Sequence, residues 1–192
     1  MKALRDAIET YGVGLGTEVV KVDSFLNHRI DVALSTEMGK AFYEAFRNEK
    51  VDCILTVEAS GIAVAMTAAQ AFGNIPVVFA KKGDHRNVGN DVYTAEVYSF
   101  THQKLNVIRV SRKYLEKGMR VLIIDDFLAN GEAVNGLTDI LRQAECELAG
   151  VGICVEKGFQ PGGKALRDKG IKVVSLAIVD AIDNGRIILR DE

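Results

Sequence analysis

The segment Val121–Ala133 reads VLIIDDFLANGEA and joins an apolar run, two adjacent acids and a loop of small residues. Four aliphatic residues lead directly into Asp125 and Asp126, which is typical of a buried parallel strand that ends at a ligand site. Both acids can meet one ligand only if the strand ends there, because successive side chains on a strand point to opposite faces. Asn130 and Gly131 then lead into a helix, whose first N–H groups favour a bound phosphate.

The same segment permits a simpler interpretation. In it, Asp125 and Asp126 form a solvated strand end, and Asn130 is an ordinary helix N-cap. We favour the phosphate site because the acids, the small-residue loop and the helix follow in the required order within thirteen residues. A dinucleotide-binding fold is a weaker rival, since the chain contains no GxGxxG motif, and a Walker A loop is also missing.

Other short β-branched runs are apolar throughout rather than alternating, as in strands that are covered on both faces. These runs lie at 53–57, 76–80, 121–124, 151–155 and 173–179. Apolar residues recur at helical spacing in three segments, at 38–46, 61–72 and 131–144. Strands and helices that alternate in this way predict an α/β fold with a doubly wound parallel sheet.

Two segments depart from this pattern. Residues 92–110 contain alternating, aromatic-rich stretches, which favour an antiparallel ribbon or an excursion from the sheet. Residues 81–91 (KKGDHRNVGND) are polar and contain glycine, so we expect a long mobile loop. We expect one domain over 1–192, in which about 1–35 and 156–192 form a smaller lobe.

Composition excludes several classes of protein. The 192 residues are 48% hydrophobic and 26% charged, which fits one globular domain. A formal charge of −2 gives no basic excess for a nucleic-acid partner. The apolar runs are shorter than the ~20 residues of a membrane span. With no visible secretory signal, we expect a cytoplasmic chain. Cys53, Cys146 and Cys154 lack ligand spacing, so we expect free structural thiols.

The paired-acid segment resembles the type I phosphoribosyltransferases, whose motif for 5-phosphoribosyl 1-diphosphate (PRPP) is an apolar strand, paired acids and a small-residue loop. Four further motifs make nearly the whole chain similar to the xanthine-specific branch of that family: KVDSFLNH at 21–28, VEASG at 57–61, VYSFT at 97–101 and VEKGFQPGG at 155–163. The resemblance implies a type I phosphoribosyltransferase fold with a hood lobe, and a homodimer.

The resemblance also implies a PRPP site. Asp125 and Asp126 would be the catalytic pair, holding the ribose hydroxyls and facing the positive charge that develops at C1′. The 5′-phosphate loop would be Ala129, Asn130, Gly131, Glu132 and Ala133. The diphosphate loop would be Glu58, Ala59, Ser60 and Gly61, often with a cis peptide bond.

Two features of this implied site have simpler alternatives. Ser60 has the alternative role of a plain N-cap. Lys81, Lys82, His85 and Arg86 carry enough charge for a lid over the diphosphate, or they form a solvated loop.

For the purine, Lys157 resembles the family lysine that donates to an exocyclic oxygen, which suits 6-oxo purines and disfavours adenine. Asn27 and the backbone near Val20 resemble a second purine contact, and Phe127 would stack on the base. The alternatives are a surface lysine at 157, a turn former at 27 and plain core at 127.

The implied reaction transfers the 5-phosphoribosyl group from PRPP to N9 of xanthine, with xanthosine 5′-monophosphate and diphosphate as products of purine salvage. Mg²⁺ would arrive on the diphosphate rather than in a protein cage. The rivals are a guanine or hypoxanthine enzyme, and a PRPP-sensing regulatory domain, which is disfavoured because the fold begins almost at the first residue. Relatives often have an acid where this chain has Ala129 and a threonine where it has Asn130, so no general base is assigned.

Overall fold

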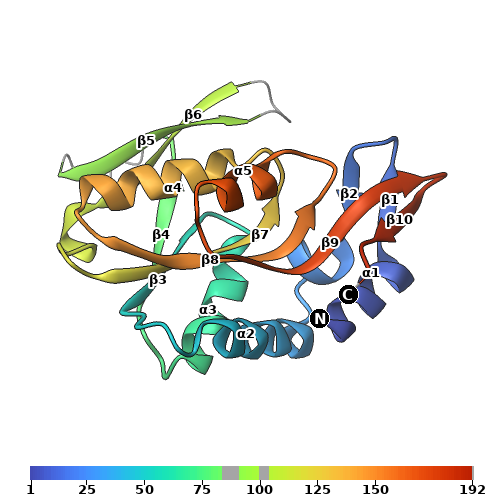
Figure 1. Cartoon of the computed structure of the whole chain (residues 1–192), viewed down its shortest axis with the longest axis horizontal. Coiled ribbons are helices and arrows are strands. Elements are labelled where there is room, and N and C mark those ends of the chain that lie inside the picture. The colour runs from blue at the N-terminus through green and yellow to red at the C-terminus, as the bar shows by residue number, and fades with distance from the viewer. Residues whose placement is uncertain (84–90, 100–103, 192) are drawn as a thin grey trace.

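An eight-stranded sheet forms the centre of the protein (Figure 1). The computed structural model describes residues 1–83, 91–99 and 104–191. The strand order is β10-β9-β8-β7-β3-β4-β6-β5, and the five strands from β9 to β4 are parallel. The strand bounds are β3 (Cys53–Val57), β4 (Val77–Lys82), β5 (Val92–Ser99), β6 (Lys104–Ser111), β7 (Arg120–Leu128), β8 (Glu147–Lys157), β9 (Val173–Asp183) and β10 (Arg186–Leu189). The predicted parallel sheet is confirmed.

Helices cover both faces of this sheet (Figure 1). On one side lie α2 (Val32–Phe46) and α3 (Gly61–Ala71), and on the other lie α4 (Glu132–Gln143) and α5 (Gly162–Asp168). The apolar run at the start of β7 serves both layers: Leu122 packs in the cluster with α2 and α3, and Ile123 in the cluster with α4. This two-sided burial explains why the run is continuous.

The N-terminal segment packs beside the C-terminal end of the chain (Figure 1). It consists of α1 (Lys2–Tyr11), the antiparallel hairpin β1 (Val13–Leu15) and β2 (Val19–Lys21), and the π-helix η1 (Asp23–Asn27). The terminal amine of Met1 donates to the carbonyl of Leu176 at 2.7 Å. The N–H of Gly14 donates to the carbonyl of Gly185 at 2.9 Å. Leu4 and Ile8 of α1 belong to the same apolar cluster as α2 and α3.

The β5–β6 ribbon is antiparallel, as the alternating pattern predicts. It is followed by a 3-10 turn, η3 (Arg112–Tyr114), and it lies over α4 (Figure 1). A Cβ atom on Gly136 of α4 would overlap with Val97 of the ribbon, so helix and ribbon approach closely at this glycine.

The expected loop at 81–91 begins later than predicted. Lys81 and Lys82 belong to β4, because Lys81 pairs with Arg109 and Lys82 with Ile108 across the ladder to β6. No helix in the described part of the chain is long and apolar enough to cross a bilayer.

Candidate active site

The two acids lie inside β7, not at its end. The strand continues to Leu128, and Asp125 pairs with Ile153 of β8. Asp125 is 5% and Asp126 9% exposed, so the interpretation of these acids as a solvated strand end is wrong. The N–H of Asp126 donates to Oδ1 of Asp125 at 3.0 Å. Burial, with the negative charge of Asp126, raises the pKa of Asp125 well above its ordinary value. Hydroxyl donors or positive charge from a ligand would stabilise this carboxylate pair.

The loop between β3 and α3 meets the acids directly. Its Glu58–Ala59 peptide bond is cis, as the resemblance implies. A Cβ atom on Gly61 would lie 2.9 Å from Oδ1 of Asp125 and closer still to Oγ1 of Thr56. That Thr56 hydroxyl is buried and has no hydrogen-bond partner among the described residues. Ser60 immediately precedes α3, but its side chain forms no capping hydrogen bond with the described part of the helix.

The turn after β7, where the phosphate loop is predicted, leads into α4 through Gly131. Gly131 has φ of +89° and is the N-cap of α4, with no side-chain cap. The alternative in which Asn130 caps the helix is therefore wrong. The turn lines a cavity of about 390 Å³, together with Lys82 and residues of the β5–β6 ribbon. The predicted site residues on this cavity are Phe127, Ala129, Asn130, Gly131, Glu132 and Ala133.

Sequence reasoning missed part of this cavity wall. Tyr98 and Asn106, for which no role was predicted, line it from the ribbon. Lys82, which was predicted only as part of a charged lid, lines it from β4. Tyr98 lies in the VYSFT motif at 97–101. This motif was the sequence signal for the residue, but it did not indicate what the side chain does. Phe127 is both a cavity residue and a half-buried neighbour of the core, so the two interpretations of its role coexist.

Lys157 lies at the end of β8, next to β7, and is half-buried. Its Nζ donates to the carbonyl of Glu18, between β1 and β2, at 2.8 Å. Burial lowers the pKa of Lys157. The same hairpin contains Val20, which is 8% exposed. Lys157 and the β1–β2 hairpin are thus brought together, whereas Asn27 is exposed at the end of η1.

Lys81 is separated from the other predicted PRPP residues. It lines a second cavity of about 610 Å³ with Phe79, Arg109 and Tyr114, whereas Lys82 faces the phosphate turn. The alternation of side chains along β4 explains this difference. The lid residues His85 and Arg86 lie outside the described residues.

In the described ranges, no group of three or more His, Cys, Asp or Glu side chains is placed to hold a metal ion. Asp125 and Asp126 supply carboxylate oxygens, which together with phosphate oxygens form a donor set that suits Mg²⁺. The residues fit a cation that the ligand carries.

A parallel sheet with buried acids between two small-residue loops defines an α/β protein that holds a phosphorylated ligand at its strand ends. The model of the phosphoribosyl transferase domain matches residues 23–185. The chain belongs to this family. It is 53% identical over 190 residues to "Xanthine phosphoribosyltransferase" of Clostridioides difficile (strain 630), covering 99% of this chain and 100% of that one. A protein of the same name from Ruminiclostridium cellulolyticum is 53% identical over 187 residues, 97% of this chain and 98% of that one.

Solved structures support the fold. The adenine phosphoribosyltransferase of Rhodothermus marinus superposes with a TM-score of 0.72 at 17% identity, over 93% of this chain and 100% of that one. The Saccharomyces cerevisiae enzyme of the same name gives a TM-score of 0.69 at 18% identity, over 92% and 99% of the two chains.

Gly61→Ala tests whether the β3–α3 loop and the acids form one site. The added methyl group pushes on Thr56 and Asp125, so we expect PRPP affinity, measured by calorimetry, to fall about 10²-fold. Gly73→Ala at the other end of α3 is the matched control, because Gly73 has φ of +87° and open space around it. The control loses about 1 kcal/mol of stability but no affinity. Equal affinities in both variants contradict the shared site.

Proposed function

We propose that this chain transfers the 5-phosphoribosyl group from PRPP to N9 of xanthine, giving xanthosine 5′-monophosphate and diphosphate in purine salvage. The observation that carries the proposal is the buried pair Asp125 and Asp126, which lies between two small-residue turns and next to the strand of Lys157. Relatives with the xanthine name match over almost the full length, which supports the choice of base.

In the proposed reaction the acids act on the ribose. Asp125 and Asp126 accept hydrogen bonds from its 2′ and 3′ hydroxyls, and their negative charge stabilises the oxocarbenium character that develops as diphosphate leaves C1′. The N–H groups of the turn at 129–133 hold the 5′-phosphate at the positive end of the α4 dipole. The loop at 58–61 holds the leaving diphosphate, and Lys82 adds positive charge to the cavity that the turn at 129–133 lines.

Lys157 is the proposed specificity residue. An ammonium only donates hydrogen bonds, so it rewards a purine oxygen and penalises the amino group of adenine. Its contact with Glu18 holds the ammonium beside the hairpin that contains Val20. The N-terminal segment through Asn27 would close over the base as a hood, and Phe127 would contact its face.

Mg²⁺ is proposed to enter with PRPP on the diphosphate oxygens. When bound, it neutralises the charge of the leaving group. Lys81 faces away from the phosphate turn in this chain, so its assignment to PRPP stays a prediction.

Assembly and location are proposed on separate grounds. A homodimer follows from the family resemblance. A cytoplasmic location is supported by Cys53, Cys146 and Cys154, which are all free thiols.

The direct test measures diphosphate release with PRPP, Mg²⁺ and each of xanthine, guanine, hypoxanthine and adenine. We expect xanthine to give the highest kcat/KM, and adenine to fall at least about 10²-fold below it because its amino group meets a donor. Equal rates for the 6-oxo purines contradict the xanthine assignment. Binding of PRPP without transfer to any base identifies a regulatory domain instead.

Asp125→Asn and Asp126→Asn test the proposed catalytic pair. Each is expected to lower kcat at least about 10²-fold, because charge that faces the transition state is lost. Their free energies of unfolding should stay equal or rise, since a buried like-charge contact is relieved. Asp139→Asn, on the exposed side of α4, is the matched control and should leave both quantities unchanged. Retained activity in the 125 and 126 variants removes these residues from the mechanism.

Lys157→Met tests base recognition. The side chain stays unbranched, loses the terminal ammonium and with it its donors, so we expect KM for xanthine to rise about 10- to 100-fold, as for a lost hydrogen bond from a charged group. The KM for PRPP should change less than the KM for xanthine. Lys164→Met, at an exposed position of α5, is the control. An unchanged KM for xanthine in the Lys157 variant would exclude the contact.

A further inference from the structure

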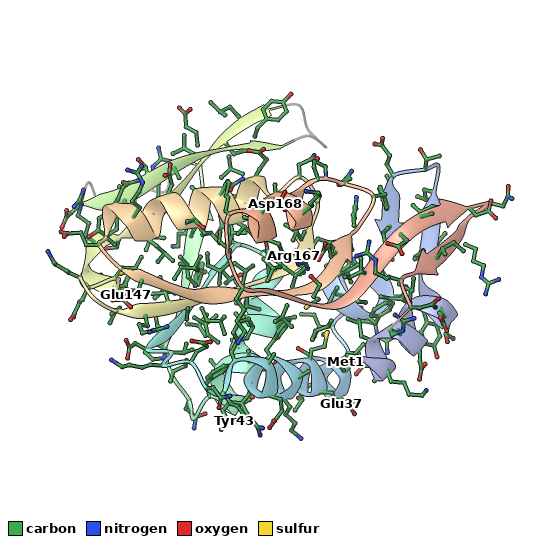
Figure 2. The ribbon with its side chains drawn as sticks, in the orientation of Figure 1. Met1, Glu37, Tyr43, Glu147, Arg167 and Asp168 are labelled. Carbon is green, nitrogen blue, oxygen red and sulfur yellow. The ribbon has the colours of Figure 1, made fainter. Side chains whose placement is uncertain are left out.

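An ion pair between buried Glu156 and partly exposed Arg167 lies beside the strand that carries the two acids. Glu156 precedes Lys157 on β8, pairs with Leu128 of β7 and is 3% exposed. Its carboxylate accepts two hydrogen bonds from Arg167, at 2.8 and 2.7 Å, and one from the hydroxyl of Ser175. Figure 2 shows Arg167 between the short helix α5 and the sheet. Although burial opposes ionisation, these hydrogen bonds hold the pKa of Glu156 below its ordinary value.

The helix that carries Arg167 also contacts the phosphate turn. The N–H of Gly162, the first residue of α5, donates to the carbonyl of Ala129 at 3.1 Å. A Cβ atom on Gly162 would lie 2.6 Å from the nitrogen of Gly131. A Cβ atom on Gly163 would overlap with the Glu156 carboxylate. The two glycines let α5 fit closely between the turn and the ion pair.

Seven residues are too few for α5 to be a stable helix by itself. Its position therefore depends on its contacts, which are the packing of Leu166 in the core, the ion pair of Arg167 and the hydrogen bond of Gly162. A buried ion pair is often replaceable by apolar side chains without loss of stability. What the fork of an arginine supplies is a fixed geometry, since both N–H groups are engaged at once.

We infer that the Glu156–Arg167 pair is a positioning device, which sets α5 and through it holds the Ala129–Gly131 turn in the shape that binds the 5′-phosphate. This inference rests on the proposed function. Neither residue touches the substrate in this scheme. Because Glu156 is also the neighbour of Lys157 on β8, the same pair links the phosphate turn to the base side of the site.

Arg167→Met tests the inference, and ribose 5-phosphate and PRPP are the calorimetric probes. We expect the affinity for both to fall about tenfold, because the turn is no longer held in register. The KM for PRPP should rise by the same factor. The change in KM for xanthine should be smaller than the change in kcat/KM for PRPP. Arg167→Lys, which keeps the charge but loses the fork, should give an intermediate affinity.

Arg120→Met is the matched control. The side chain of Arg120 is 35% exposed, against 37% for Arg167, and it pairs with Glu49 and Glu147 at the opposite end of β7 and β8. This variant should lose stability without losing affinity for either probe. An equal affinity loss in the control overturns the inference, and so does an unchanged affinity in Arg167→Met.

The double variant Glu156→Gln/Arg167→Met separates positioning from stability. It leaves no unpaired buried charge, so its melting temperature should recover towards that of the wild type. Its affinity for ribose 5-phosphate should stay low, because the fork is still missing; recovered affinity overturns the inference. If the wild type binds ribose 5-phosphate but transfers no phosphoribosyl group from PRPP to any purine, the proposed function is wrong. The binding experiments on the variants still test the inference in that case.

Discussion

Two adjacent carboxylates buried in a central strand are the constraint on which the site depends. Burying charge without a partner is costly, and here the pKa of Asp125 is raised by burial and by Asp126. Both side chains are largely covered, so little water reaches them. In the proposed site, a ligand with hydroxyl donors would satisfy the acids, and its phosphates would meet the N–H groups at the starts of α3 and α4.

The sheet topology brings these groups to one place. Strands β3, β7 and β8 are parallel neighbours, so their carboxyl ends meet at one edge. The β3–α3 loop, the turn after β7 and Lys157 at the end of β8 follow from these three ends. The β5–β6 ribbon closes the cavity from outside the parallel core, and Gly162 of α5 contacts the turn at Ala129. Chemistry contributed by distant sequence segments is therefore concentrated by one rule of α/β folds.

The sequence predicted those features that depend on local pattern. Continuous apolar runs identified the parallel strands, and helical spacing identified α3 and α4. The predicted end of β7 was wrong. The two acids were expected to stop the strand, whereas tertiary contacts prolong it to Leu128. The separation of Lys81 from Lys82 requires the exact ladder of β4 with β6, which composition does not reveal. Glu156 was also missed, since its partners lie 11 and 19 residues away.

Lys157, the proposed specificity residue, is held by the N-terminal hairpin. An ammonium has three donors, and the carbonyl of Glu18 takes one of them. The side chain that carries the remaining donors is already fixed at its tip. Less conformational entropy is therefore lost when a purine oxygen accepts a hydrogen bond from it. Burial lowers the pKa of Lys157, whereas the negative charge of Glu18 in the hairpin raises it. If Lys157 is the specificity residue, as proposed, recognition of a purine oxygen depends on the hairpin as well as on the lysine itself.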